Sequence, residues 1–68
     1  MKRGEKMKNN IEKFRKELNL SQEQLAEKAD ISRMTISNIE SGKQKIVRSI
    51  TMEKLAKALG KKIYEVFF

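Results

Sequence analysis

The sequence contains no cysteine, no histidine, no proline and no tryptophan among its 68 residues. Without cysteine and histidine, the chain has no disulfide, no thiolate nucleophile and no zinc site made from the usual ligands. The side chain that most often serves as a general base is also missing. We therefore expect no enzyme activity, no catalytic residue, no metal site and no cofactor, and no small-molecule ligand is evident.

Long apolar runs are missing as well. No segment approaches the roughly 20 apolar residues that a membrane-spanning helix needs, and no signal-peptide core follows the basic start. The absence of proline and of alternating β-branched segments gives strands little support. A chain this short buries only about 60% of the surface of its unfolded form, which suits one small core. These features predict a single all-α domain without a membrane partner.

Positive charge is in excess. Sixteen Lys and Arg residues against nine Asp and Glu residues give a net charge of +7. Residues 1–8 have no apolar periodicity and are predicted to form a flexible basic arm, followed by the domain at residues 9–68. The excess also extends through that domain, which indicates an anionic partner such as nucleic acid, although such a charge also favours solubility alone.

Capping residues and apolar spacing predict five short helices. The first has Asn10 as its N-cap, an apolar side made of Ile11, Phe14 and Leu18, and a stop at Asn19.

The second helix begins at Ser21, which forms a capping-box pattern with Gln24, and ends at Asp30. Its buried stripe consists of Leu25, Ala26 and Ala29. The third begins after the Ser32 cap, turns Ile36 and Ile39 inward and ends at Gly42. The fourth runs from Ser49 or Thr51 to Leu59 before Gly60, and the last packs Ile63 with Val66 or Phe67.

The link between the second and third helices is only about three residues long. So short a link prevents a flat antiparallel pair and forces a steep crossing, which small alanines permit. The outer face of the third helix has short polar groups and one arginine where a merely solvated face usually has Glu and Lys. This face, suited to hydrogen bonding with bases, consists of Arg33, Met34, Thr35, Ser37, Asn38 and Ser41.

Two segments carry a family resemblance. Ser21-Gln-x-x-Leu-Ala-x-x-Ala29, followed by Ile31-Ser-Arg-x-Thr-Ile-Ser-x-Ile-Glu-x-Gly42, resembles the helix-turn-helix of the lambda-repressor and Cro type. The resemblance implies a compact five-helix lambda-repressor-like domain with its helix-turn-helix at helices 2 and 3. Asp30 departs from the glycine common in that turn, and Val47-Arg48 from a common Pro-Ser. These departures affect helix boundaries rather than the binding face.

The resemblance also implies roles for individual residues. Arg15 and Glu40 are expected to bridge the first and third helices, unless they are only a surface pair of little weight. Met34 is expected at DNA, although methionine often fills gaps in a core. The loop cations are expected on the sugar-phosphate backbone, unless they are simply solvated. The expected DNA-binding residues are Gln22, Ser32, Arg33, Met34, Thr35, Ser37, Asn38, Lys43, Lys45 and Arg48.

The function expected from the resemblance is a sequence-specific regulator of transcription, most simply a repressor. Because one helix recognises few base pairs, we expect a homodimer on a palindromic double-stranded DNA operator, with the dimer surface at Val66, Phe67 and Phe68. A cytoplasmic location in a bacterium or phage host follows from the family alone. The alternative is an antitoxin or another protein-interaction module with secondary DNA binding, which a neighbouring toxin-like gene would favour.

Overall fold

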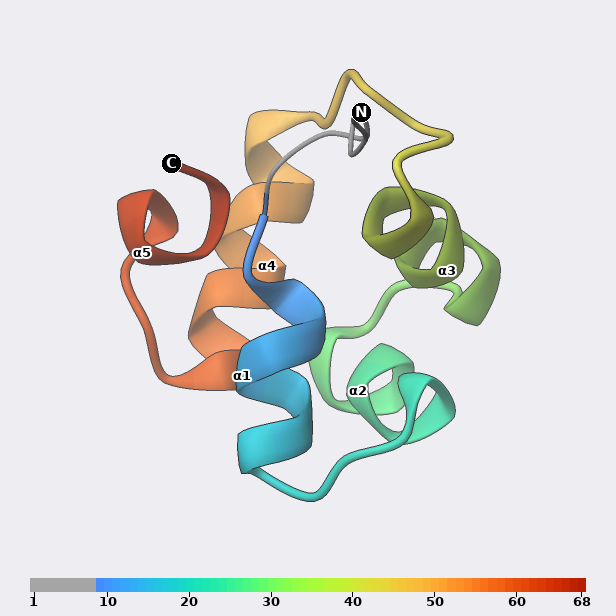
Figure 1. Cartoon of the computed structure of the whole chain (residues 1–68), viewed down its shortest axis with the longest axis vertical. Helices are drawn as coiled ribbons and strands as arrows, with labels where there is room; N and C mark the ends of the chain where they lie inside the picture. The colour runs from blue at the N-terminus through green and yellow to red at the C-terminus, as the bar shows by residue number, and fades with distance from the viewer. Residues whose placement is uncertain (1–8) are drawn as a thin grey trace, which may run out of the picture.

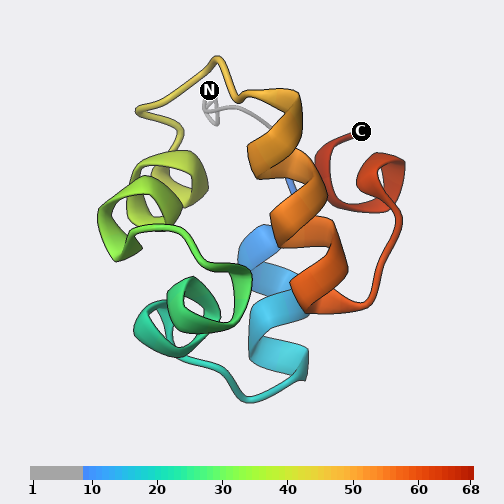
Figure 2. The same cartoon turned by 180° about the vertical axis from the view of Figure 1, so that it is seen from behind.

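The fold is arranged around α4 (Ser49–Leu59), which packs against α1, α2 and α5. The computed structural model describes residues 9–68, and all regular structure in this range is helical. Figures 1 and 2 show α3 and α5 on opposite sides of the molecule, with α4 between them. The predicted all-α architecture of five helices is therefore confirmed. The predicted basic arm at residues 1–8 lies outside the described residues.

Asn10 is the N-cap residue of α1 (Ile11–Glu17), as predicted, but it makes no side-chain cap. The Oδ1 of the preceding Asn9 accepts a hydrogen bond from the Ile11 N–H at 3.1 Å. The Asn10 side chain donates from Nδ2 to the Glu65 carbonyl at 2.8 Å. Asn10 therefore ties the first helix to α5 (Ile63–Phe67).

The end of α1 is partly as predicted. Asn19 has the expected positive φ of 60°. Leu18 was expected on the buried side, but 46% of its surface is exposed. The helix ends at Glu17, so Leu18 lies beyond the last helical residue, where the α1 periodicity no longer sets its direction.

The capping box of α2 (Gln22–Ala29) is confirmed in both directions. The Ser21 Oγ accepts from the Gln24 N–H at 3.0 Å, and the Gln24 Oε1 accepts from the Ser21 N–H at 2.8 Å. These bonds satisfy two of the amide groups that a helix start leaves without intrahelical partners. The start of α2 is thus fixed by its own sequence.

Every helix contributes to one core. The largest fully buried side chains come from all five elements, and they are Ile11, Leu25, Ile36, Ile39, Leu55 and Val66. Ile36 and Ile39 place the inner side of α3 (Arg33–Ser41) against this core. Removing any one of these aliphatic side chains would cost about 2–5 kcal/mol, because the surroundings collapse only partly into the cavity. The core thereby fixes which face of α3 remains outside.

Candidate nucleic-acid interface

The link before α3 is short and hydrogen-bonded. Asp30 has a φ of 60°, and the next N–H, of Ile31, donates to the Ala26 carbonyl at 3.0 Å. The Ser32 Oγ then accepts from the Thr35 N–H at 3.0 Å and lies 2.8 Å from the Thr35 hydroxyl. Because both ends of the link are held, α3 begins at a defined residue, Arg33.

The outer face of α3 is open to solvent at its start. Arg33 and Met34 are exposed, while Ser37 and Asn38 are half-buried. With 71% of its surface exposed, Met34 does not fill a gap in the core. A guanidinium, a thioether, a hydroxyl and an amide thus lie along one helix face, and these groups can meet the donors, acceptors and methyl groups of base edges.

The only acidic side chain of α3 points away from this face. The Glu40 carboxylate accepts from the Arg15 Nε at 2.8 Å and from its Nη2 at 3.1 Å. The side chains are 10% and 6% exposed, so the predicted contact forms as a buried pair rather than a surface one. The hydrogen bond to Glu40 raises the pKa of Arg15 further above its usual value, against the opposing effect of burial.

This pair also engages Gln22. The Gln22 Nε2 donates to the Glu40 Oε1 at 3.0 Å, and the Arg15 Nη1 donates to the Leu20 carbonyl at 2.8 Å. Gln22, expected to contact DNA, is half-buried, and its side chain is directed to Glu40. The network therefore joins α1, the start of α2 and the end of α3, and it holds α3 in position.

The loop after α3 presents the three predicted cations, Lys43, Lys45 and Arg48, all exposed. The Gln44 N–H donates to the Asn38 carbonyl at 3.1 Å, which holds the loop against α3. The loop cations and the outer face of α3 are therefore parts of one continuous surface.

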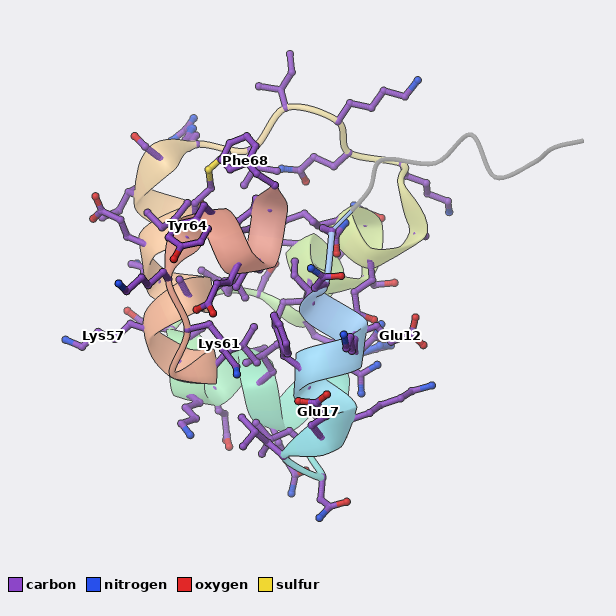
Figure 3. All side chains as sticks on the ribbon, turned by 60° about the vertical axis from the view of Figure 1, so that its left-hand side comes forward. Glu12, Glu17, Lys57, Lys61, Tyr64 and Phe68 are labelled. Carbon is purple, nitrogen blue, oxygen red and sulfur yellow. The ribbon has the colours of Figure 1, made fainter. Side chains whose placement is uncertain are left out.

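The predicted dimer surface is wrong at two of its three residues. Val66 is fully buried and Phe67 is 8% exposed, because this side of α5 packs into the monomer core. Phe68 is 89% exposed, and with Tyr64 it borders a groove of about 570 Å³ between α4 and α5. Figure 3 shows Tyr64 and Phe68 on the outer surface and, farther along the same side, Lys61, whose Nζ lies 4.7 Å from the Phe14 ring centroid.

No group of three acidic residues that could hold a metal ion occurs within residues 9–68. No helix in this part of the chain is long and apolar enough to cross a bilayer.

Three residues that matter for the surface were missed by sequence reasoning. Asn9 bonds the start of α1, Tyr64 borders the groove beside Phe68, and Ile46 projects from the cationic loop with 85% of its surface exposed. The place of Ile46 in a loop with three cations was a signal that was available in the sequence. Asn9 donates from Nδ2 to the Ile39 carbonyl of α3 at 3.1 Å, and Tyr64 lies on α5, so both positions depend on tertiary packing that no local pattern indicates.

The chain was compared with known proteins. A family model described as helix-turn-helix matches residues 11–66. An uncharacterised HTH-type transcriptional regulator of Methanocaldococcus jannaschii is 43% identical over 61 residues, which are 90% of this chain and 91% of the relative. Both matches include α2, α3 and the loop that follows.

Two solved structures have a similar fold. The restriction-modification controller protein C.AhdI of Aeromonas hydrophila matches with a TM-score of 0.79 and 31% identity, over 85% of this chain and 86% of that protein. The hypothetical transcription factor NHTF from Neisseria matches with a TM-score of 0.78 and 34% identity, over 87% of this chain and 67% of that one.

Proposed function

Because the chain belongs to the helix-turn-helix family of DNA-binding transcriptional regulators, we propose that it binds a palindromic operator as a dimer and represses transcription. The observation that carries this proposal is the outer face of α3, which is free of acid and continuous with the cationic loop. In this family geometry the helix lies in the major groove, with its first residues at the base edges.

Base recognition is assigned to residues 33–38 of α3. Arg33 offers two parallel N–H donors that match guanine O6 and N7, and Asn38 offers a donor and an acceptor that match adenine. Met34 is placed to pack on a thymine methyl, and Ser37 supplies an adaptable hydroxyl. Each good bidentate pair would contribute about 1–3 kcal/mol of discrimination between bases.

Phosphate binding is assigned to Ser32, Thr35, Lys43, Lys45 and Arg48. Gln22 keeps a second amide hydrogen beside its bond to Glu40, and the N–H groups at the start of α2 lie next to it. These contacts set orientation and affinity rather than sequence preference.

Dimerisation is assigned to the face of α5 that carries Tyr64 and Phe68. α5 lies on the opposite side of the molecule from α3, as Figures 1 and 2 show. A two-fold axis beside α5 would therefore place the two copies of α3 on the far sides of the dimer, and we expect them to be about one DNA turn of 34 Å apart. Repression would follow from occlusion of a promoter by the bound dimer.

The experiment that tests this function is selection of bound sites from random double-stranded DNA, with sedimentation of the free and bound protein. We expect an enriched palindrome with half-sites about 10 base pairs apart, bound by two copies of the chain. Absence of any enriched sequence would contradict the proposal, and capture of a specific protein partner instead would favour the antitoxin alternative.

Substitution of the adjacent residues Phe67 and Phe68 tests the proposed dimer surface separately. Phe68→Ala should leave the free energy of unfolding nearly unchanged and weaken the dimer, since the ring is exposed. Phe67→Ala should cost about 3–5 kcal/mol of stability, because its ring lies in the core. A Phe68→Ala protein whose dimer dissociates no more readily than wild type would contradict this placement.

A further inference from the structure

Ile46 is an apolar side chain in a polar, positively charged loop. It is 85% exposed, more than Met34 on the recognition face of α3. Its neighbours along the loop include Lys45 and Arg48, both exposed, and residues 41–52 contain no acidic side chain. A single exposed aliphatic side chain is common on a protein surface, but this one lies among cations in the loop next to α3, where one partner can meet both the apolar group and the charges.

The exposure of Ile46 is fixed by the loop structure. The Gln44 Nε2 donates to the Ile46 carbonyl at 3.1 Å, and the Gln44 N–H is bonded to the Asn38 carbonyl of α3. On the other side, Val47 is buried in the core. The Ile46 carbonyl thus accepts a hydrogen bond, and the next residue, Val47, is buried in the core. Because the backbone is held on both sides, Ile46 lies on the outside of the molecule beside α3.

We propose that Ile46 inserts into the minor groove next to the major-groove segment that α3 occupies, and wedges against a base step there. This inference rests on the proposed DNA binding. The minor groove is about 6 Å wide and has a phosphate strand on each edge. Residues 45 to 48 span at most about 10 Å, so Lys45 and Arg48 can each approach one strand while the side chain between them faces the groove floor.

DNA fits this loop better than a second copy of the chain does. Two such loops in contact would bring Lys43, Lys45 and Arg48 against the same cations of the partner, and residues 41–52 supply no acidic side chain to offset them. Phosphates supply the opposite charge on both sides of the wedge, and the loop is continuous with the outer face of α3. Apolar wedges in the minor groove favour steps that unstack easily, so Ile46 should confer a preference for TA or CA steps outside the bases that α3 contacts.

The test uses duplexes recovered by the selection experiment, with wild type, Ile46→Ala and Ile50→Ala. Ile50 is also an exposed isoleucine, at 53%, but it lies on α4 beyond the cations and serves as the matched control. In each duplex, adenine at the flanking steps is replaced by 2,6-diaminopurine. This base adds an amino group in the minor groove and keeps the major-groove pattern of the A·T pair.

For wild type and Ile50→Ala, we expect diaminopurine at the flanking steps to weaken binding about tenfold, which matches the loss of one buried aliphatic contact. Ile46→Ala should bind the unmodified duplex about tenfold more weakly than wild type and should be insensitive to diaminopurine. Its unfolding midpoint should match that of wild type.

Two results would overturn this inference while leaving the DNA-binding function intact. In the first, Ile46→Ala binds the unmodified duplex as tightly as wild type, and diaminopurine weakens the binding of all three proteins equally. In the second, Ile46→Ala has a different oligomeric state from wild type, which would assign the side chain to contacts between copies of the chain. Failure of wild type to select any sequence would instead refute the proposed function itself.

Discussion

The neighbouring helices α2 and α3 share their construction but differ in their outer faces. Each begins at a serine whose Oγ accepts a main-chain N–H at 3.0 Å, and each ends at a residue with positive φ. Each also buries an apolar stripe in the same core. Outside, α2 carries Glu23, Glu27 and Lys28, whereas α3 carries Arg33, Met34 and polar groups. Local capping therefore sets the ends of both helices. The side chains of the outer face distinguish α3, which is proposed to contact bases, from α2, which supports it.

The two helices differ most clearly in where their acidic side chains lie. The acids of α2 are exposed, while Glu40 of α3 is buried against Arg15. A carboxylate on the outer face of α3 would repel phosphates, so its inward position serves the fold and keeps the face free of negative charge.

The largest expected effect comes from removing this inward acid. Glu40→Ala should lower the free energy of unfolding by about 3–5 kcal/mol, because it leaves the Arg15 guanidinium buried without its partner. Glu27→Ala, on the exposed side of α2, should change stability by less than about 0.5 kcal/mol. Urea denaturation of the two variants measures the difference, and equal losses would contradict a structural role for the buried pair.

The two serine caps, Ser21 and Ser32, allow an effect on stability to be separated from an effect on DNA binding. Ser21→Ala and Ser32→Ala should each cost about 1 kcal/mol of stability, because each removes a cap of the same geometry. Ser32→Ala should also weaken DNA binding more than Ser21→Ala does, since Ser32 is itself one of the residues proposed to contact phosphate. Thermal unfolding and DNA titration at a temperature where both variants are folded would separate the two effects. Equal losses of affinity would mean that α2 and α3 contact DNA alike.

The smallest effect on stability is expected from exposed cations. Lys45→Ala should leave folding unchanged and reduce the salt dependence of DNA binding by about 0.9 in the slope of log K against log salt, for all sequences alike. Lys28→Ala, which removes an exposed cation from α2, should leave that slope as in wild type. A slope that changes equally in both variants would place a phosphate contact at Lys28, on the outer face of α2, as well as on the loop.

The helix ends were predictable from sequence because capping is local chemistry. Ser21, Ser32, Asp30, Gly42 and Asn19 all have the conformation or hydrogen bond that their side chains favour. The buried stripes of α2 and α3 followed from apolar spacing over eight or nine residues, a length at which one face is clearly defined.

The features that the sequence left open are positions that tertiary packing decides. The Asn10 side chain is drawn to α5, so the side chain that bonds the start of α1 is that of Asn9. A helix of five residues has too few positions for its apolar face to be assigned, so the burial of Phe67 and exposure of Phe68 could not be separated. The contact of Gln22 with Glu40 joins residues 18 apart in sequence, and no local pattern indicates it.

The central claim is that the outer face of α3 recognises bases, and Arg33→Lys tests it most directly. Lysine keeps the charge but loses the planar fork that matches guanine. A base-by-base preference profile of the variant on the selected operator should show relaxed discrimination at one base pair of each half-site, with a loss of about 1–3 kcal/mol there and nearly unchanged binding to unrelated DNA. A profile identical to that of wild type, with affinity reduced equally on all sequences, would contradict base recognition by Arg33.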